Sequence, residues 1–374
     1  MRPPPTPLKT GETSGSPEGE RKMRGSGRTG TCGLTADCSP RSSVSNSLDQ
    51  QELADNYSIL RQLGSGTYGR VVLARCHRTG VEVALKVLPK ASTKLKDFLR
   101  EFNLSYYLSP HSAIINTYDV AFETLTSYVF AQEQAPLGDL FEAITPQSGL
   151  TESAAKAALA QVASALEFMH SKGLVHRDVK PENILVFDDA CERVKLMDFG
   201  MTKKTGTMVR KVSTGIPYTP PEVCSALKGE QYAVDTAADV WGFAVLIFCA
   251  LTGNFPWELA HQSDTFYGEF SAWQRRKALR MPSQWKMFTS RLMRLFRRML
   301  EPRPERRCSI KELCKYTDDA WLLPRKDSPS TEDTPPRRVD PHDDLDSLLR
   351  KHGIETEVSP HWRERRISEW ILAM

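Results

Sequence analysis

Residues 176–183 read HRDVKPEN, and this stretch decides the fold. At an average residue usage of about one in twenty, five specified positions amount to a coincidence of roughly 10⁻⁶ per starting position. The stretch places a carboxylate, an ammonium group and an amide close together, at Asp178, Lys180 and Asn183. We interpret His176 as structural, because a histidine beside an arginine would orient the loop rather than act as a base.

A second acidic position follows on the C-terminal side. DFG stands at 198–200, fifteen residues beyond Asn183. Carboxylate and amide oxygens are the ligands that hard divalent cations prefer. Asp198 and Asn183 are therefore predicted to share a metal ion.

On the N-terminal side, GSGTYGRV at 64–71 has glycines at its first, third and sixth positions. Glycine lets backbone N–H groups approach a phosphate without obstruction by a Cβ atom. In a dinucleotide-binding fold this loop would open a helix, whereas the following RVVLARC reads as a strand. Taken alone the stretch is weak evidence, and a simple glycine turn is the alternative.

VALK at 83–86 alternates like a strand, so Ala84 and Lys86 share one face. A strand lysine is more often simply solvated, and a functional Lys86 needs a carboxylate partner in the next helix. Glu101 in KDFLREF is the predicted partner; Asp97 and Glu123 fit less well. At about 4 Å and an effective dielectric near 20, such a pair interacts by roughly 4 kcal/mol before desolvation.

The chain divides by composition into four parts. Residues 1–52 and 324–374 are rich in Pro, Gly, Ser and charge and are predicted to be disordered, apart from a possible short helix at the C-terminal end. Residues 53–134 contain strand patterns with one helix near 92–108, and 135–323 contain mainly helices. The clearest helix spans 151–171, with Thr151 as its cap, and the apolar run 240–253 is too short to span a bilayer and reads as a buried helix.

Composition excludes several function classes. The 374 residues carry a net charge of only +4, which gives no reason to expect nucleic acid or a membrane surface as a partner. Eight scattered cysteines lack metal-like or disulfide-like spacing, and the N-terminus lacks a secretory apolar segment. A cytoplasmic protein without a membrane span is expected, with the nucleus left open, and it is expected to be a monomer.

In this order, the motifs resemble those of the protein kinase superfamily from about Tyr57 to Trp321, roughly 70% of the chain. KLKDFLRE, YVFAQE, GDLFEAI, TGNFPWE and PSQW look like the Src-homology-3-binding serine/threonine kinases. The resemblance implies an α+β bilobal fold: a small antiparallel-sheet N-lobe (53–134) with one main helix, and a larger, mainly helical C-lobe (135–323). It also implies ATP and Mg²⁺ as nucleotide and metal, and proteins as substrates.

The resemblance assigns roles residue by residue. Asp178 becomes the catalytic base, Lys180 neutralises the transferred phosphoryl group, Lys86 with Glu101 holds the phosphates, and Asn183 and Asp198 bind Mg²⁺. Gln132 becomes the gatekeeper, an unusual polar one, and Gln134 belongs to the hinge. The expected nucleotide-binding residues, besides Lys86, are Leu63, Gly64, Ser65, Gly66, Thr67, Tyr68, Gly69, Arg70, Val71, Ala84, Glu133, Ala135, Asp139 and Leu185.

Serine/threonine kinases carry a lysine at the position of Lys180, whereas the same stretch in tyrosine kinases resembles HRDLAARN. Serine or threonine is therefore the expected acceptor. PPE at 220–222 matches the APE element, and Glu222 is expected to pair with Arg307 or Arg306. Asp139 and Glu182 stand where basophilic relatives hold a basic substrate residue, but Cys249 replaces a third acid there.

Thr214-Gly215 inverts the usual Gly-Thr, which braces the catalytic residues in relatives. A pseudokinase scaffold is therefore the alternative function, although Lys86, Asp178 and Asp198 are all present. A small-molecule kinase is not supported, because the APE-like substrate platform is intact. Arg177 beside Asp178 suggests control by phosphorylation at Ser213 or nearby; Thr202, Thr205 and Thr207 are the other candidates.

Two tail motifs suggest regulation. PPTPLK at Pro4–Lys9 has the PxxPx+ pattern of Src-homology-3 ligands, although proline-rich tails mostly serve as spacers. Arg365, Arg366 and Ser368 form an RRxS site, and the segment Trp362–Met374 could dock on the kinase body.

Overall fold

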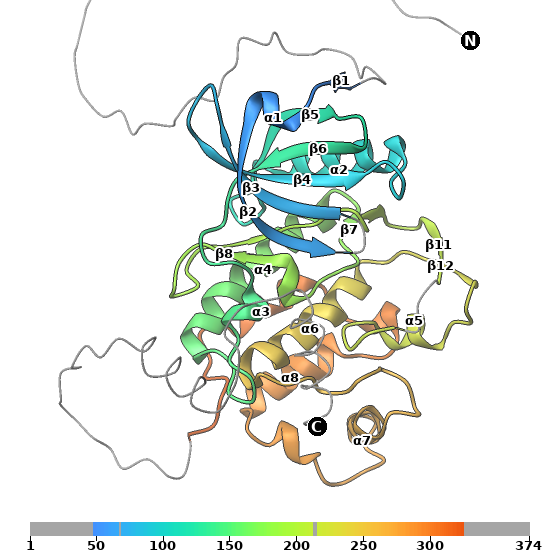
Figure 1. The fold of residues 1–374 in the computed structure, drawn as a ribbon. Coiled ribbons are helices and arrows are strands. Elements are labelled where there is room, and N and C mark those ends of the chain that lie inside the picture. Colours follow the sequence, from blue (N-terminus) through green and yellow to red (C-terminus); the bar gives the residue numbers. More distant parts are fainter. Residues whose placement is uncertain (1–47, 67–68, 212–214, 325–374) are drawn as a thin grey trace, which may run out of the picture. The chain divides into compact units, whose positions relative to one another are not determined.

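The computed structural model describes residues 48–66, 69–211 and 215–324, all within one structural unit. The predictions for residues 1–47 and 325–374, including the Pro4–Lys9 and Ser368 motifs, lie outside the described residues. A six-stranded sheet comes first along the chain, and a mainly helical part follows it (Figure 1).

The sheet has the order β1-β5-β6-β4-β3-β2. Its strands are β1 (Asp49–Gln50), β2 (Tyr57–Gly66), β3 (Gly69–Cys76), β4 (Glu82–Pro89), β5 (Thr117–Glu123) and β6 (Ser127–Gln132). All described pairings are antiparallel except that of β1 with β5, where Asp49 pairs with Phe122. The two residues of β1 show no sequence pattern of their own, and a short helix, α1 (Leu53–Asn56), connects them to β2.

Helix α2 (Leu95–Leu108) is the one main helix of the sheet lobe. Phe98 and Phe102 form an apolar cluster with Leu88 and Phe130 of the sheet. The helix begins later than the predicted residue 92, because the N–H groups of Ser92 and Thr93 form a turn onto the carbonyl oxygen of Pro89. The antiparallel sheet and its helix are otherwise as predicted.

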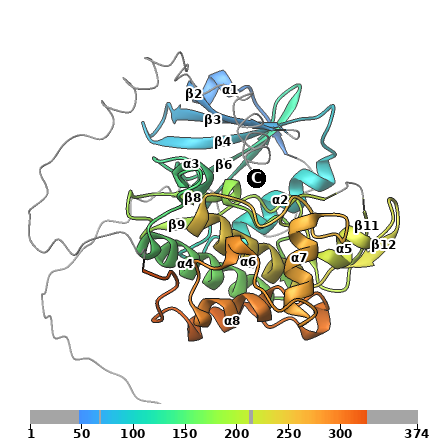
Figure 2. The ribbon, with the colours of Figure 1, turned by 90° about the horizontal axis from the view of Figure 1, so that it is seen from below.

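Helices α4 (Glu152–Ser171), α6 (Ala237–Thr252) and α8 (Ser290–Met299) form the centre of the second lobe (Figure 2). The predicted cap is present, because the Thr151 hydroxyl accepts from the Ala154 N–H at 3.2 Å. Helix α6 is buried on nearly all sides and ends at Gly253, whose φ of +65° favours glycine. A Cβ atom at Gly253 would also lie 2.2 Å from the Thr145 carbonyl oxygen.

Shorter elements hold the loops between these helices. They are α3 (Leu140–Ala143), β7 (Leu174–Val175), β8 (Ile184–Val186), β9 (Val194–Leu196), β10 (Lys203–Lys204), β11 (Met208–Arg210), α5 (Pro221–Ser225), β12 (Gln231–Ala233) and α7 (Thr265–Gln274). Strand β7 pairs with β10, β8 with β9, and β11 with β12. The first two ladders bracket HRDVKPEN and DFG, and so hold both motifs at fixed positions relative to each other.

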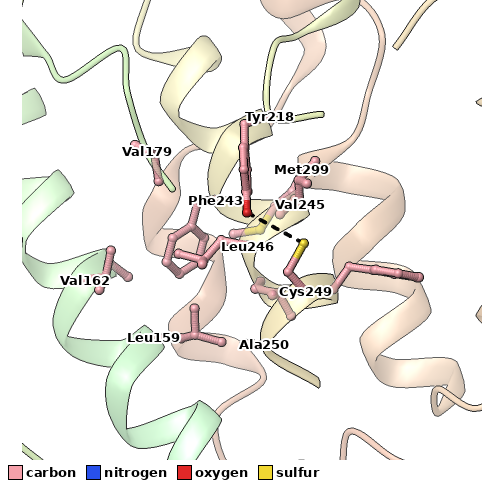
Figure 3. Packing of buried hydrophobic residues seen from close by; sticks show 14 of the residues in the cluster. Leu159, Val162, Val179, Tyr218, Phe243, Val245, Leu246, Cys249, Ala250 and Met299 are labelled. Carbon is pink, nitrogen blue, oxygen red and sulfur yellow. Dashed lines mark hydrogen bonds between the residues drawn. The ribbon is translucent and has the colours of Figure 1, made fainter. Parts of the chain in front are cut away.

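The core of the helical lobe packs side chains of α4 against α6 (Figure 3). Leu159 and Val162 contribute from α4, and Phe243 contributes from α6, all fully buried. Within this apolar region the Tyr218 hydroxyl donates to Cys249 Sγ at 3.8 Å. Burial raises the pKa of both Tyr218 and Cys249, so this part of the core carries no charge at neutral pH.

Glu222 pairs with Arg307, which confirms the first of the two predicted partners. The guanidinium donates to both carboxylate oxygens at 2.9 Å and also binds the carbonyl oxygens of Ala237 and Glu301. Its side chain is fully buried, whereas Arg306 is exposed. The pair joins the segment around α5 to the helical core.

None of the helices in the described part of the chain has the length and hydropathy of a membrane-spanning segment.

Substituting Glu222 by Ala should destabilise the chain by about 3 kcal/mol, because it leaves a buried guanidinium without its carboxylate. Chemical denaturation of the full chain measures this. Arg306→Ala is the matched control and should change the free energy of unfolding by less than about 0.5 kcal/mol. Equal effects of the two substitutions would contradict the account.

Candidate active site

One buried carboxylate of the helical lobe holds the backbone of the HRDVKPEN loop. Asp239 of helix α6 is 1% exposed, and its two oxygens accept from the backbone N–H groups of His176 and Arg177, each at 2.8 Å. His170 at the end of α4 adds a third contact at 2.8 Å. Asp239 therefore fixes the loop against the most buried helix of the molecule, which sequence reasoning did not identify.

Both ring nitrogens of His176 are engaged. Nε2 donates to the Met197 carbonyl oxygen at 3.0 Å, and Nδ1 accepts from the Asp178 N–H at 3.3 Å. The ring is fully buried and packs edge-on against Phe199. His176 therefore connects the HRD loop with the DFG segment, which agrees with its predicted structural role.

The carboxylate of Asp178 is held on one of its oxygens. Oδ2 accepts from the Asn183 amide at 2.8 Å and lies 3.0 Å from the Lys180 ammonium. Burial lowers the pKa of Lys180, but the Asp178 carboxylate outweighs burial and the pKa is raised. Lys180 is thus a cation beside Asp178. Among the described residues, both contacts fall on Oδ2, which leaves Oδ1 as the oxygen for a further partner.

Lys86 and Glu101 meet as predicted, and Asp198 joins them. The Lys86 ammonium lies 2.5 Å from Glu101 Oε1 and 3.2 Å from Asp198 Oδ1. Burial lowers the pKa of Lys86, but the carboxylates of Asp198 and Glu101 more than offset it, so the pKa is raised. Burial raises the pKa of Asp198, and the Lys86 charge and the Gly200 N–H outweigh it, so that pKa is lowered. Lys86 and Asp198 are therefore both charged at neutral pH.

Two close approaches depend on the local backbone. Asp198 has a φ of +64°, a strained conformation that aims its carboxylate at Lys86. A Cβ atom at Gly200 would lie 3.1 Å from Glu101 Oε2, so a small residue lets helix α2 approach DFG.

A cavity of about 570 Å³ lies beside this cluster. Eleven of the predicted site residues line it: Leu63, Gly64, Val71, Ala84, Lys86, Glu101, Glu133, Ala135, Asp139, Leu185 and Asp198. Ser65, Gly66, Gly69, Arg70, Asp178, Lys180 and Asn183 do not line it, and Thr67 and Tyr68 lie outside the described residues. The sheet lobe and the helical lobe both contribute walls.

At two positions of the glycine loop, packing does not require glycine. A Cβ atom at Gly64 or Gly66 would meet nothing within 4 Å. At Gly69 a Cβ atom would lie 2.4 Å from the Val87 carbonyl oxygen, so packing does require this glycine. Gly64 and Gly66 therefore fit a loop whose backbone approaches a ligand.

Two predicted nucleotide-binding residues have side chains occupied elsewhere. The Glu133 carboxylate accepts from Lys195 at 2.5 Å and from the Asn116 N–H at 2.6 Å. Asp139 accepts from the Glu142 N–H at 3.0 Å and caps helix α3. The Glu133 N–H donates to the Asn116 carbonyl oxygen at 2.9 Å, so the backbone carbonyl oxygen of Glu133 is the part that can serve the cavity.

Sequence reasoning missed several residues of the cavity wall. Met197 directly precedes DFG and could have been found by its position. Ser105 and Ile115 come from α2 and the segment before β5, and only the packed structure places them there. Gln132, the predicted polar gatekeeper, also lines the cavity.

The residues present fit a magnesium ion. The Asn183 amide nitrogen donates to the Asp178 carbonyl oxygen and carboxylate, both at 2.8 Å, which leaves the amide oxygen as the ligand atom. With the ionised Asp198 carboxylate it makes a pair of hard oxygen donors of the kind that Mg²⁺ takes.

The segment after DFG is held by basic side chains. Arg177 donates to the Met201 carbonyl oxygen and to the Tyr232 hydroxyl, each at 3.1 Å, and Lys211 donates to the carbonyl oxygens of Cys224 and Ala226. Of the predicted phosphorylation candidates, Thr202 is fully buried, and Ser213 lies outside the described residues.

Gly215, the second residue of the inverted pair, has a φ of +115°. This conformation favours glycine, and a Cβ atom there would lie 2.7 Å from Leu259. The backbone thus requires glycine where relatives are expected to carry threonine.

Comparison with known proteins identifies the family. The protein kinase domain family matches residues 57–317. Serine/threonine-protein kinase SBK1 of Danio rerio is 54% identical over 280 residues, 75% of this chain and 73% of that protein. SBK1 of Mus musculus is 52% identical over 269 residues, covering 72% and 64% of the two chains, and Serine/threonine-protein kinase SBK2 of Homo sapiens is 42% identical over 278 residues, covering 73% and 80%.

These matches confirm the predicted bilobal kinase fold and the resemblance to the Src-homology-3-binding kinases. The chain belongs to the protein kinase family, among its serine/threonine protein kinases.

Proposed function

We propose that this kinase transfers the γ-phosphate of magnesium-bound ATP to serine and threonine hydroxyls of protein substrates. The observation that carries the proposal is the contact of one largely buried lysine, Lys86, with both Glu101 and Asp198 beside the 570 Å³ cavity. An ammonium group held by two carboxylates is a poor choice for stability alone, because Lys86 and Glu101, 14% and 12% exposed, lose most of their hydration.

Each residue of the cluster has its own task. Asp178 orients the substrate hydroxyl and accepts its proton, and Lys180 keeps a positive charge beside it. Lys86 holds phosphate oxygens, and Glu101 fixes Lys86. Magnesium, held by Asn183 and Asp198, supplies charge neutralisation of the phosphates.

The cavity wall suits an adenine nucleotide. Leu63, Val71, Ala84 and Leu185 offer apolar surface for a flat ring, with the segment around Ala135 as the hinge. Its volume lies within the range of small-molecule sites. Because a Cβ atom at Gly64 or Gly66 would meet no neighbouring atom, the loop backbone at these positions is open to approach by phosphates.

Substrate preference and regulation are further proposals. Asp139 and Glu182 support a weak preference for basic residues upstream of the acceptor. Cys249, which stands where relatives carry a third acid, is uncharged and bonded to the Tyr218 hydroxyl. Burial and the charges of Arg100 and Arg177 lower the pKa of Lys203, which supports control by a phosphate placed nearby. A cytoplasmic monomer that binds Src-homology-3 domains through Pro4–Lys9 remains a proposal.

A scaffold without catalysis is the second candidate. The observation in its favour is Gly215, whose backbone excludes the threonine that braces the catalytic residues in relatives. The direct contact of Lys180 with Asp178 at 3.0 Å counts against it, because these two residues already hold each other.

Asp178→Asn should lower the rate of phosphoryl transfer by about 10²- to 10⁴-fold, because the amide cannot accept the hydroxyl proton. Initial-rate assays with radiolabelled ATP and a serine/threonine peptide library measure this, and ATP affinity should not change. Asp189→Asn, an exposed acid on a nearby turn, is the matched control. Equal rates for wild type and Asp178→Asn would favour the scaffold.

Asp198→Asn should raise the magnesium concentration needed for half-maximal rate by at least about tenfold, because a neutral amide replaces an anionic ligand. Rates measured over a magnesium series test this, again against Asp189→Asn. An unchanged magnesium requirement would show that Asp198 does not hold the metal.

A further inference from the structure

The most basic segment of the chain lies in the helical lobe, from the end of α7 to the end of α8. Residues 275–300 contain nine Lys and Arg residues and no Asp or Glu. The whole chain has a net charge of +4, so without these nine charges the other residues have a net charge of −5. The small net charge of the chain therefore conceals a strongly basic segment.

Six of the nine cations are exposed and form no ion pair within the described part of the chain. We call them the basic face: Arg275, Arg276, Lys277, Arg280, Lys286 and Arg294. Two others are matched by carboxylates, Arg291 by Asp319 at 2.7 Å and Arg298 by Glu312 at 3.2 Å. Like charges within a Debye length of about 8 Å repel one another, so an anionic partner relieves this repulsion.

Packing of α7 against α8 brings these cations onto one side of the lobe. Gln274, at the end of α7, donates to the carbonyl oxygens of Arg297 and Leu300 at the end of α8, at 3.1 and 2.9 Å. Residues 275–277 directly follow Gln274, and Arg294 precedes Arg297 by one helical turn. Both groups of cations therefore lie at the junction of the two helices.

Lys286 belongs to the same junction. It follows Trp285, whose ring centre lies 4.4 Å from that of Phe270 in α7 and 5.1 Å from that of Phe296 in α8. Leu279, between α7 and Trp285, is 102% exposed, so apolar surface lies among the cations. A partner that fits this face needs both anionic and apolar groups.

The described part of the chain ends beside the basic face. The Leu323 N–H donates to the Met287 carbonyl oxygen at 2.8 Å, and Leu322 forms a β-bridge with Phe288. Met287 is the neighbour of Lys286 in the sequence. The chain beyond residue 324 therefore starts from the edge of this face.

A segment of matching chemistry follows shortly afterwards. Residues 340–349 read DPHDDLDSLL, with four Asp, three Leu and no Lys or Arg. The 16 residues from 324 to 340 reach about 50 Å when extended, and about 20–24 Å on average as a flexible chain. Such a tether gives an effective concentration in the millimolar range, so even a weak contact is populated.

We propose that residues 340–349 bind the basic face of the same molecule, with their carboxylates on its Arg and Lys side chains and their leucines against Leu279. The proposal does not rest on the proposed function, because the basic face shares no residue with the candidate active site. The bound segment covers the junction of α7 and α8 and competes there with any acidic partner protein.

Carbodiimide cross-linking of the full chain tests this contact, because the reagent joins a carboxylate to a lysine only where the two touch. Trypsin releases residues 339–350 as one peptide. A cross-linked Lys277 is then found in the peptide 277–280, and a cross-linked Lys286 in the peptide 281–291. Mass spectrometry measures the yield of each pair.

The peptide 339–350 should be joined to Lys277 and Lys286 at least about tenfold more often than to Lys94 and Lys228. Lys94 and Lys228 are exposed as well but lie outside the basic face. Raising the salt concentration about tenfold should lower the yield at Lys277 and Lys286, because salt screens exposed charges.

Charge reversal separates recognition from mere proximity. Arg276→Glu/Arg280→Glu keeps both reactive lysines and should lower both yields at least about fivefold, because the new carboxylates repel the acidic segment. Arg78→Glu/Lys94→Glu makes the same change of charge at exposed positions of the sheet lobe and should have no effect. Arg276→Gln/Arg280→Gln is the milder pair if the first variant fails to fold.

The apolar part of the contact has its own variant. Leu279→Ser should lower the yields about threefold, because the leucines of the segment lose their partner. Leu125→Ser, at a leucine that is 74% exposed in the sheet lobe, is the matched control and should leave them unchanged.

Mixing chains labelled with ¹⁴N and ¹⁵N identifies the occupant. Cross-links within one isotope support the proposal, whereas cross-links between isotopes show that a second copy occupies the face and overturn it. Binding of the full chain to phosphatidylserine vesicles that Arg276→Glu/Arg280→Glu abolishes would make anionic lipid the occupant and also overturn it. Equal yields at Lys277 and Lys94, or a charge reversal without effect, would do the same.

Discussion

The ion pairs of Lys86 are the interaction on which the active arrangement depends. They connect strand β4, helix α2 and the DFG segment, three elements from distant parts of the chain. A buried ammonium group is stable only when its charge is matched, and here two carboxylates match it. Any movement of α2 or of DFG away from β4 leaves at least one charge without its partner.

The helical lobe fixes the position of the catalytic loop through backbone hydrogen bonds rather than through ion pairs. Asp239 anchors the backbone of His176 and Arg177 from within α6, and the ring of His176 fastens the loop to the DFG segment. Asp178 then needs only Lys180 and Asn183 to hold its carboxylate. The sheet lobe thus provides a site that depends on the orientation of one helix, and the helical lobe provides a rigid base.

Local motifs explain why so much could be predicted from sequence. HRDVKPEN, DFG, VALK and the glycine loop each carry their chemistry in adjacent residues, and the periodicity of residues 151–171 fixed a helix to within one residue. Features that depend on packing could not be predicted. Strand β1 has too few residues to show alternation, the carboxylate of Glu133 is engaged by Lys195 from a distant strand, and Ser105 and Thr117 look like ordinary polar residues until α2 is packed on the sheet. Asp239 was hidden for the same reason, since its partners are backbone groups about 60 residues away.

The central claim is that Lys86 is required for catalysis and not simply one charge among many. Lys86→Met compared with Lys90→Met tests it directly, because Lys86 lies in β4, Lys90 directly follows it, and both pair with a glutamate of the same lobe. Initial rates of phosphoryl transfer from ATP to a serine/threonine substrate are the measurement. The account predicts a loss of about 10²-fold or more for Lys86→Met and a rate close to wild type for Lys90→Met. Similar rates for the two variants would contradict it.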